Sequence, residues 1–261
     1  MSLLTEIAAD SNKIGIGSTP LIRIGNSGIY SKLEYLNRFH SIKDRAAFFM
    51  LDYALKTGRL KTGMTVIEGS SGNTGIAIAG ISNLLGFHSE IVLPESAPHE
   101  TVKALKRYGA DVIITPGNST ENSINYAVER ARASPDKYYR PDQHENEMNS
   151  NAHYYGTGPE IAREIPHPDH LVIGIGTGGT ITGLSRFFKH RGNTMVTGII
   201  PEEGSHITGL RNPFRSDYKS LIEKYRNYID EIITVSQDDA YSGVRELKEK
   251  YNLFCRPFIG C

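Results

Sequence analysis

One lysine lies where a side-chain amine could do covalent chemistry. Lys43 stands in the segment Ser41-Ile42-Lys43-Asp44-Arg45, directly before the apolar helical pattern of Ala46–Leu55. If Ser41 caps this helix, Lys43 falls in its first turn, where the positive end of the helix dipole would lower the lysine's pKa. A lysine must be neutral to attack a carbonyl and form a Schiff base. Taken alone, such a segment is far more often a solvated charged triplet.

A first glycine-rich segment has the residue types of an anion site. It reads Glu68-Gly69-Ser70-Ser71-Gly72-Asn73-Thr74-Gly75 and lies between a predicted strand and a predicted helix. Backbone N–H groups at a helix N-terminus attract anions, and hydroxyl and amide side chains add donors that suit a carboxylate or a phosphate. A plain turn with Ser or Asn as the helix cap would look similar. The segment alone leaves both interpretations open.

A second glycine-rich segment has the residue types of a phosphate site. It reads Gly174-Ile175-Gly176-Thr177-Gly178-Gly179-Thr180, and Glu202 lies near the end of the next strand. This is close to the G-x-G-x-x-G dinucleotide fingerprint with its later acidic residue. That fingerprint usually opens the first βαβ unit of a domain, whereas several strands and helices precede it here. Two threonines also suit a phosphate monoester, so the segment predicts phosphate binding without deciding the cofactor.

The elements that must position these segments alternate along the chain. Strands are predicted at Met64–Glu68, Glu90–Pro94, Asp111–Thr115, Leu171–Gly174, Met195–Ile200 and Glu231–Val235. Helices are predicted at Thr74–Leu85, His99–Tyr108, Glu121–Ala133, Ile181–Lys189 and Asp238–Lys250. This order predicts a doubly wound α/β architecture, and the apolar runs indicate strands buried on both faces of parallel sheets. The polar segment Pro141–Asn151 is the candidate domain crossing.

Composition narrows the class of protein. The 261 residues carry 29 Lys+Arg against 29 Asp+Glu, which argues against a nucleic-acid binder. Ten of the 26 glycines fall in residues 63–80 and 174–183, which contain the two segments. Cys255 and Cys261, the only cysteines, have no zinc spacing and form no disulfide framework. The N-terminus lacks a signal-peptide pattern and the longest uncharged stretch is short and glycine-rich, so we expect a cytoplasmic protein away from membranes.

Together, and in this order, the three segments resemble the cysteine synthase family of pyridoxal-phosphate (PLP) enzymes. The likeness runs from about Gly17 to Phe254 and includes Thr19-Pro20-Leu21, Lys32-Leu33-Glu34, Pro94-Glu95, and Gln143 ahead of Asn146. The sequence His153-Tyr154-Tyr155-Gly156-Thr157-Gly158-Pro159-Glu160 and the sequence Gly209-Leu210-Arg211-Asn212 look more like the branch that accepts O-phosphoserine than the O-acetylserine branch.

The resemblance implies a role for each matching residue. Lys43 would hold PLP covalently and move the substrate's α-proton, and Asn73 would bind the cofactor's phenolic oxygen. The cofactor phosphate would lie on Gly176, Thr177, Gly178, Gly179 and Thr180. The substrate carboxylate would be held by Ser70, Ser71, Gly72, Thr74 and Gln143. Arg211 would pair with a phosphate leaving group, or is a surface arginine in a polar loop.

The family also implies a fold and a reaction. The fold would be the two-domain PLP fold of type II, similar to the tryptophan synthase β subunit, in a homodimer. A smaller domain of residues 37–146 would carry Lys43 and the first glycine-rich segment, which contains Asn73. Residues 1–36 together with 147–261 would form a larger domain that carries the second glycine-rich segment. The reaction would be β-replacement, in which an oxygen leaving group departs from the substrate and sulfide adds to give L-cysteine.

The sequence departs from the family pattern at its C-terminal end. The family places a Ser or Thr beside the pyridine nitrogen in a small-residue turn, where this chain has Phe258 or Ile259. Neither side chain can donate a hydrogen bond, so we expect PLP binding with less certain turnover. Three alternatives stay open: a serine/threonine dehydratase type of β-elimination, a catalytically impaired relative that binds PLP or a partner, and an NAD-dependent dehydrogenase.

Overall fold

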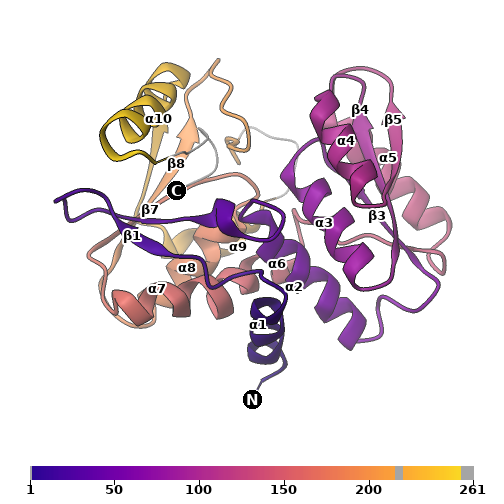
Figure 1. Cartoon of the computed structure of the whole chain (residues 1–261), viewed down its shortest axis with the longest axis horizontal. Coiled ribbons are helices and arrows are strands. Elements are labelled where there is room, and N and C mark those ends of the chain that lie inside the picture. Colours follow the sequence, from indigo (N-terminus) through magenta and orange to yellow (C-terminus); the bar gives the residue numbers. More distant parts are fainter. Residues whose placement is uncertain (1, 215–219, 254–261) are drawn as a thin grey trace. The chain divides into compact units, whose positions relative to one another are not determined.

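The computed structural model describes residues 2–214 and 220–253, and the chain divides into two compact units. We call the residues up to Ile42 together with those from His144 onward the first unit, and Lys43–Gln143 the second unit. Figure 1 draws the elements of both.

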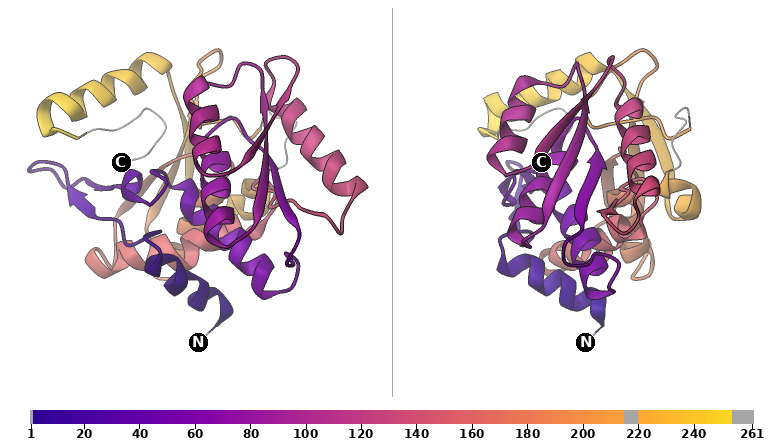
Figure 2. Two further views of the ribbon diagram at one scale, coloured as in Figure 1. Left: turned by 45° about the vertical axis from the view of Figure 1, so that its right-hand side comes forward. Right: turned by 90° about the vertical axis from the view of Figure 1, so that its right-hand side faces the viewer.

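The second unit is built on a parallel sheet of four strands. The strands are β3 (Thr65–Gly69), β4 (His88–Pro94), β5 (Asp111–Thr115) and β6 (Tyr138–Tyr139), in the order β5-β4-β3-β6. Its helices are α2 (Lys43–Lys56), α3 (Asn73–Leu84), α4 (His99–Arg107) and α5 (Thr120–Ala133). Figure 2 shows α5 along one face of this sheet and α3 along the other.

Two close contacts fix helices on opposite faces of this sheet. A Cβ added at Gly69 would lie 2.5 Å from the backbone of Ile124, so glycine is what allows α5 to approach the end of β3. On the other face, a Cβ at Gly75 of α3 would lie 3.0 Å from the side chain of Ile91 in β4. All of β3 and all but the first residue of β4 are buried, as their apolar sequence predicts.

The first unit holds a parallel sheet of three strands. These are β7 (His170–Gly174), β8 (Met195–Pro201) and β9 (Glu231–Val235), in that order. The helices are α1 (Leu3–Lys13), α6 (Glu147–Ala152), α7 (Gly158–Glu164), α8 (Gly179–Lys189), α9 (Leu221–Tyr225) and α10 (Gln237–Tyr251). Smaller pieces are the hairpin of β1 (Leu21–Arg23) and β2 (Tyr30–Lys32), the 3₁₀ turns η1 (Glu34–Leu36) and η3 (Arg226–Tyr228), and the π-helical turn η2 (His153–Thr157).

Most predicted elements are confirmed to within two residues, and the α/β class with parallel sheets is confirmed. The prediction of strands buried on both faces is wrong for the first unit. Ile173 packs against the core, but Val172 is 62% exposed and Ile233 in β9 is 41% exposed. In the described part of the chain, one face of this sheet is therefore partly exposed. None of the described helices is both long enough and apolar enough to cross a membrane.

Candidate functional site

Lys43 is the first residue of α2, which confirms its predicted place in the first turn of a helix. The lysine is half-buried, while its neighbours Asp44 and Arg45 are buried. The fourteen residues of α2 direct the positive end of their dipole at this position.

The asparagine loop, residues 69–75, joins β3 to α3, and α3 begins at Asn73. The Thr74 hydroxyl donates to Oε1 of Gln143 at 2.7 Å, although the two residues are 69 positions apart. Both side chains are buried. The structure therefore brings together two of the residues predicted to bind a carboxylate, and the bond orients the Gln143 amide with its oxygen toward Thr74.

The two serines of the asparagine loop have other contacts. Ser70 Oγ accepts the N–H of Gly75 at 3.2 Å and is buried, so its oxygen braces the turn. Ser71 Oγ lies 3.0 Å from the Thr120 hydroxyl at the start of α5. Both serines support the shape of the loop, and each hydroxyl has further hydrogen-bonding capacity.

The phosphate loop, Gly176–Thr180, joins β7 to α8 and is shaped by its glycines. Gly178 has a φ of +88°, which disfavours any side chain. A Cβ at Gly176 would lie 2.5 Å from the carbonyl oxygen of Gly209, and one at Gly179 would lie 2.0 Å from Oδ1 of Asn149. The close approaches leave no room for side chains, so the backbone itself forms the wall of the loop.

Buried side chains from α6 and the π-helical turn hold both threonines of the phosphate loop. Asn149 Nδ2 donates to Thr177 Oγ1 at 2.9 Å, and His153 Nε2 lies 3.2 Å from Thr180 Oγ1. Asn149 is 2% exposed and His153 is 1% exposed. Two positioned hydroxyls at the N-terminus of an eleven-residue helix fit a phosphate monoester.

The π-helical turn is itself fixed on both sides. His153 Nδ1 lies 2.9 Å from the Thr157 hydroxyl, so both ring nitrogens have partners. A Cβ at Gly183 of α8 would lie 2.3 Å from the Ser150 carbonyl and 2.7 Å from His153 Cβ. Single π-helical turns are frequent at functional sites, and this one points a histidine at the phosphate loop.

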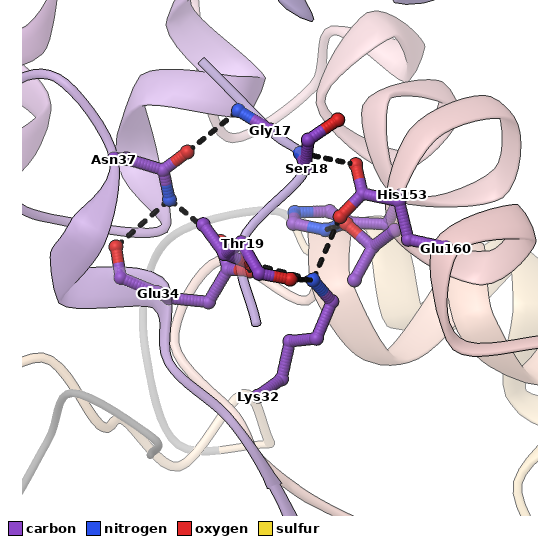
Figure 3. A network of polar contacts seen from close by, with 9 residues as sticks. Gly17, Ser18, Thr19, Lys32, Glu34, Asn37, His153 and Glu160 are labelled. Carbon is purple, nitrogen blue, oxygen red and sulfur yellow. Dashed lines mark hydrogen bonds and ion pairs between the residues drawn. The ribbon is translucent and has the colours of Figure 1, made fainter. Parts of the chain in front are cut away.

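A buried polar network ties the N-terminal segment to α7 (Figure 3). The Lys32 ammonium bonds Glu160 at 2.7 Å and Thr19, and the N–H of Ser18 donates to Glu160 at 2.9 Å. Glu34 accepts from Thr19 at 2.7 Å and from Asn37 at 2.8 Å. Because α7 directly follows the π-helical turn, this network also stabilises the turn whose His153 contacts Thr180 of the phosphate loop.

Arg211 is attached to the phosphate loop through its backbone. Its N–H donates to the carbonyl of Ile175 at 2.8 Å, one residue before the loop begins. Arg211 as a whole is half-buried, and its Nη1 atom is buried. The sequence pattern alone did not place Arg211 beside this loop.

Glu68 is a buried carboxyl directly before the asparagine loop. It is fully buried at 0% exposure, and Oε2 accepts the N–H of Asp142 at 3.0 Å. Burial raises the pKa of Glu68 from 4.5 to about 7, against the opposing effect of the Arg140 guanidinium; the charge of Asp142 raises it further. A glutamate kept inside a buried strand needs a structural reason, because an ionised carboxylate is costly there.

Sequence reasoning missed Glu68, Asn149 and His153 as contributors to these loops. Glu68 carried a signal, as the one charged residue at the end of an apolar strand. Asn149 lay inside the polar segment taken only as a domain crossing. The expectations for Phe258 and Ile259, and both cysteines, lie outside the residues that the structure describes.

The raised pKa of Glu68 predicts a pH-dependent stability. The folded state binds this proton more tightly than the unfolded chain, so its contribution is full below pH 4.5 and is lost as pH rises through about 7. We expect the free energy of unfolding of Glu68→Gln to fall less than that of the wild type across this interval, measured by urea denaturation at several pH values. Parallel curves for the two proteins would contradict the assignment.

Comparisons with known proteins identify the family. Residues 13–261 match the family described as pyridoxal-phosphate dependent enzyme. Cysteine synthase B of Escherichia coli (strain K12) is 37% identical over 249 residues, which cover 92% of this chain and 81% of that protein.

Solved structures give the same result for the fold. That of O-ureido-L-serine synthase superposes with a TM-score of 0.85 at 27% identity, covering 94% of this chain and 81% of that one. Cysteine synthase from Entamoeba histolytica gives 0.83 at 29% identity, covering 99% and 79%. The fold is thus that of type II PLP enzymes and the cofactor is PLP, not a dinucleotide. This chain belongs to the pyridoxal-phosphate dependent enzyme family, among the relatives of the cysteine synthases.

Proposed function

We propose that this protein makes L-cysteine by β-replacement, from O-acetylserine or O-phosphoserine and a sulfide donor. The observation that carries the proposal is the bond between Thr74 and Gln143, which joins two distant segments into one candidate carboxylate site. The likeness to cysteine synthase B, at 37% identity over nearly the whole chain, supports the same reaction. The phosphate loop and Lys43 supply the residue types that PLP needs.

Different residues are proposed for each part of the cofactor. Thr177 and Thr180, held by Asn149 and His153, would donate to the cofactor phosphate together with the N–H groups at the start of α8. Asn73, at the start of α3, would bind the phenolic oxygen. When bound, PLP supplies an electron sink that stabilises negative charge on the substrate's Cα.

Lys43 would perform the proton transfer. Its Nζ would hold the cofactor covalently until the substrate's amine displaces it, and the released lysine amine would then take the proton from Cα of the amino-acid substrate. Acetate or phosphate leaves Cβ with its bonding electrons, and sulfide forms a new bond to the same carbon. Return of a proton to Cα completes L-cysteine. The half-buried place of Lys43 at the N-terminus of α2 supports this role.

The asparagine loop would hold the substrate carboxylate. Gln143 presents its amide oxygen to Thr74, so its NH₂ group, a pure donor, can serve an anion. The hydroxyls of Ser70 and Ser71 and the backbone around Gly72, at the N-terminus of α3, would add donors. Anchoring the carboxylate fixes Cα relative to the lysine, which is where most of the orientation benefit arises.

The role of Lys43 gives the direct test of the proposal. Protein incubated with PLP and reduced with borohydride should carry the pyridoxyl group on the peptide that contains Lys43. Lys43→Ala should lose at least about a hundredfold in the rate of cysteine formation, since a positioned base contributes that much or more. The exposed Lys61 provides a matched control, and Lys61→Ala should retain full activity.

Two results would contradict the proposed function. Labelling at Lys43 with no cysteine formed from either substrate would indicate an impaired relative. Release of pyruvate and ammonia from serine, without incorporation of sulfide, would indicate a β-eliminating enzyme of the dehydratase type.

Arg211 gives a test of the leaving group. Arg211→Ala should raise KM for O-phosphoserine by about tenfold or more, because hydrogen bonds to charged groups contribute about 1.5–3 kcal/mol. KM for O-acetylserine should change little, and Arg59→Ala, at an exposed arginine, should change neither. Equal losses with both substrates would remove Arg211 from phosphate recognition.

A further inference from the structure

Glu68 faces the side of the sheet that carries the asparagine loop. It pairs with Ile91 of β4 and shares its face, and Ile91 contacts Gly75 of α3. The neighbouring Glu90 pairs with Ile67 and so lies on the opposite face. Glu90 is held by Tyr138 at 3.0 Å and Arg130 at 2.9 Å. The two buried glutamates are therefore a natural pair for comparison.

The contacts of Glu68 point to the segment that ends at Gln143. Its Oε2 accepts the N–H of Asp142, while Oε1 has no hydrogen-bond partner within residues 2–214 and 220–253. Asp142 has a φ of +57° and its side chain pairs with Arg140. A non-glycine residue in the left-handed region needs support from its surroundings, and Glu68 supplies it at the peptide nitrogen.

Asp142 directly precedes Gln143, and this short stretch is contacted from both β3 and α3. Glu68 binds its backbone from β3, and Thr74 binds the Gln143 side chain from α3. Release of the Asp142 N–H would free the backbone that aims the amide of Gln143. Because Asp142 sits in a strained conformation, the stretch would relax once this contact is lost.

We propose that Glu68 is a positioning residue that orients Gln143 to receive the substrate carboxylate, by fixing the Asp142 N–H. This inference rests on the proposed function, which gives Gln143 its ligand. The burial that raises the pKa of Glu68 to about 7 is consistent with this role, because the neutral and ionised carboxyl can both accept the N–H.

Three variants distinguish the effect of losing the hydrogen-bond acceptor of Glu68 from the effect of changing the shape of its side chain. Glu68→Gln keeps both an oxygen acceptor and the shape. Glu68→Met keeps the approximate shape and removes the acceptor. Glu90→Met, at the glutamate on the opposite face, breaks a partly buried ion pair and serves as the control for loss of stability.

We expect Glu68→Met to raise KM for O-acetylserine or O-phosphoserine by about tenfold or more while kcat changes less, as for loss of a hydrogen bond at a charged group. Glu68→Gln should keep KM within about twofold of the wild type. Glu90→Met should lower the unfolding free energy and leave KM unchanged. PLP content should be equal in all variants.

Hydrogen exchange provides a second readout that needs neither cofactor nor turnover. In the apoprotein, exchange of the Asp142 amide should be faster in Glu68→Met and unchanged in Glu68→Gln and Glu90→Met. An unchanged KM in Glu68→Met, or an altered KM in Glu68→Gln, would overturn the proposal. If Glu68→Met does not fold, Glu68→Gln still tests the proposal, because an altered KM there would overturn it. If the wild type is inactive on both substrates, the proposed function is contradicted. The contact between Glu68 and Asp142 is still tested, because the exchange measurement does not depend on activity.

Discussion

The first unit is organised around the close approach of α8 to α6 and the π-helical turn. Gly179 and Gly183 make this approach possible, since a Cβ at either position would collide with Asn149 or with the Ser150 backbone. The approach brings Asn149 and His153 within hydrogen-bond distance of Thr177 and Thr180. Packing of one helix against another thereby positions the two hydroxyls that we propose bind the cofactor phosphate, without any cationic side chain in the loop itself. This explains how a chain of zero net charge can present an anion site.

The second unit positions the residues of its proposed carboxylate site in a different way. Its asparagine loop follows a fully buried strand, and its partner Gln143 comes from the far end of the unit. The buried carboxyl of Glu68 and the hydroxyl of Thr74 converge on this stretch from the strand and the helix. Buried polar groups of this kind stabilise little in net terms, but they select one arrangement because any other leaves them unpaired.

The parts of the fold that local sequence determines could be predicted. Apolar β-branched runs located β3, β4 and β8, and the order of a lysine and two glycine-rich segments indicated the family. The polar segment Pro141–Asn151, interpreted from sequence only as a candidate domain crossing, contains most of helix α6, although Asn and Ser compete with helical backbone bonds. Asn146 caps this helix and α8 packs on it, and neither effect is visible in a pattern. The Thr74–Gln143 and Asn149–Thr177 contacts span 69 and 28 residues and arise only from tertiary packing.

The dissociation constant of PLP tests the central claim most directly, namely that close packing of glycine shapes the phosphate loop. In Gly179→Ala the new Cβ must displace Asn149, which holds Thr177. Titration of the apoprotein with PLP should then show binding at least about tenfold weaker than the wild type. Gly192→Ala, whose Cβ would meet only His167 at 3.8 Å, should bind normally. A folded Gly179→Ala protein that binds PLP as tightly as the wild type would contradict the account.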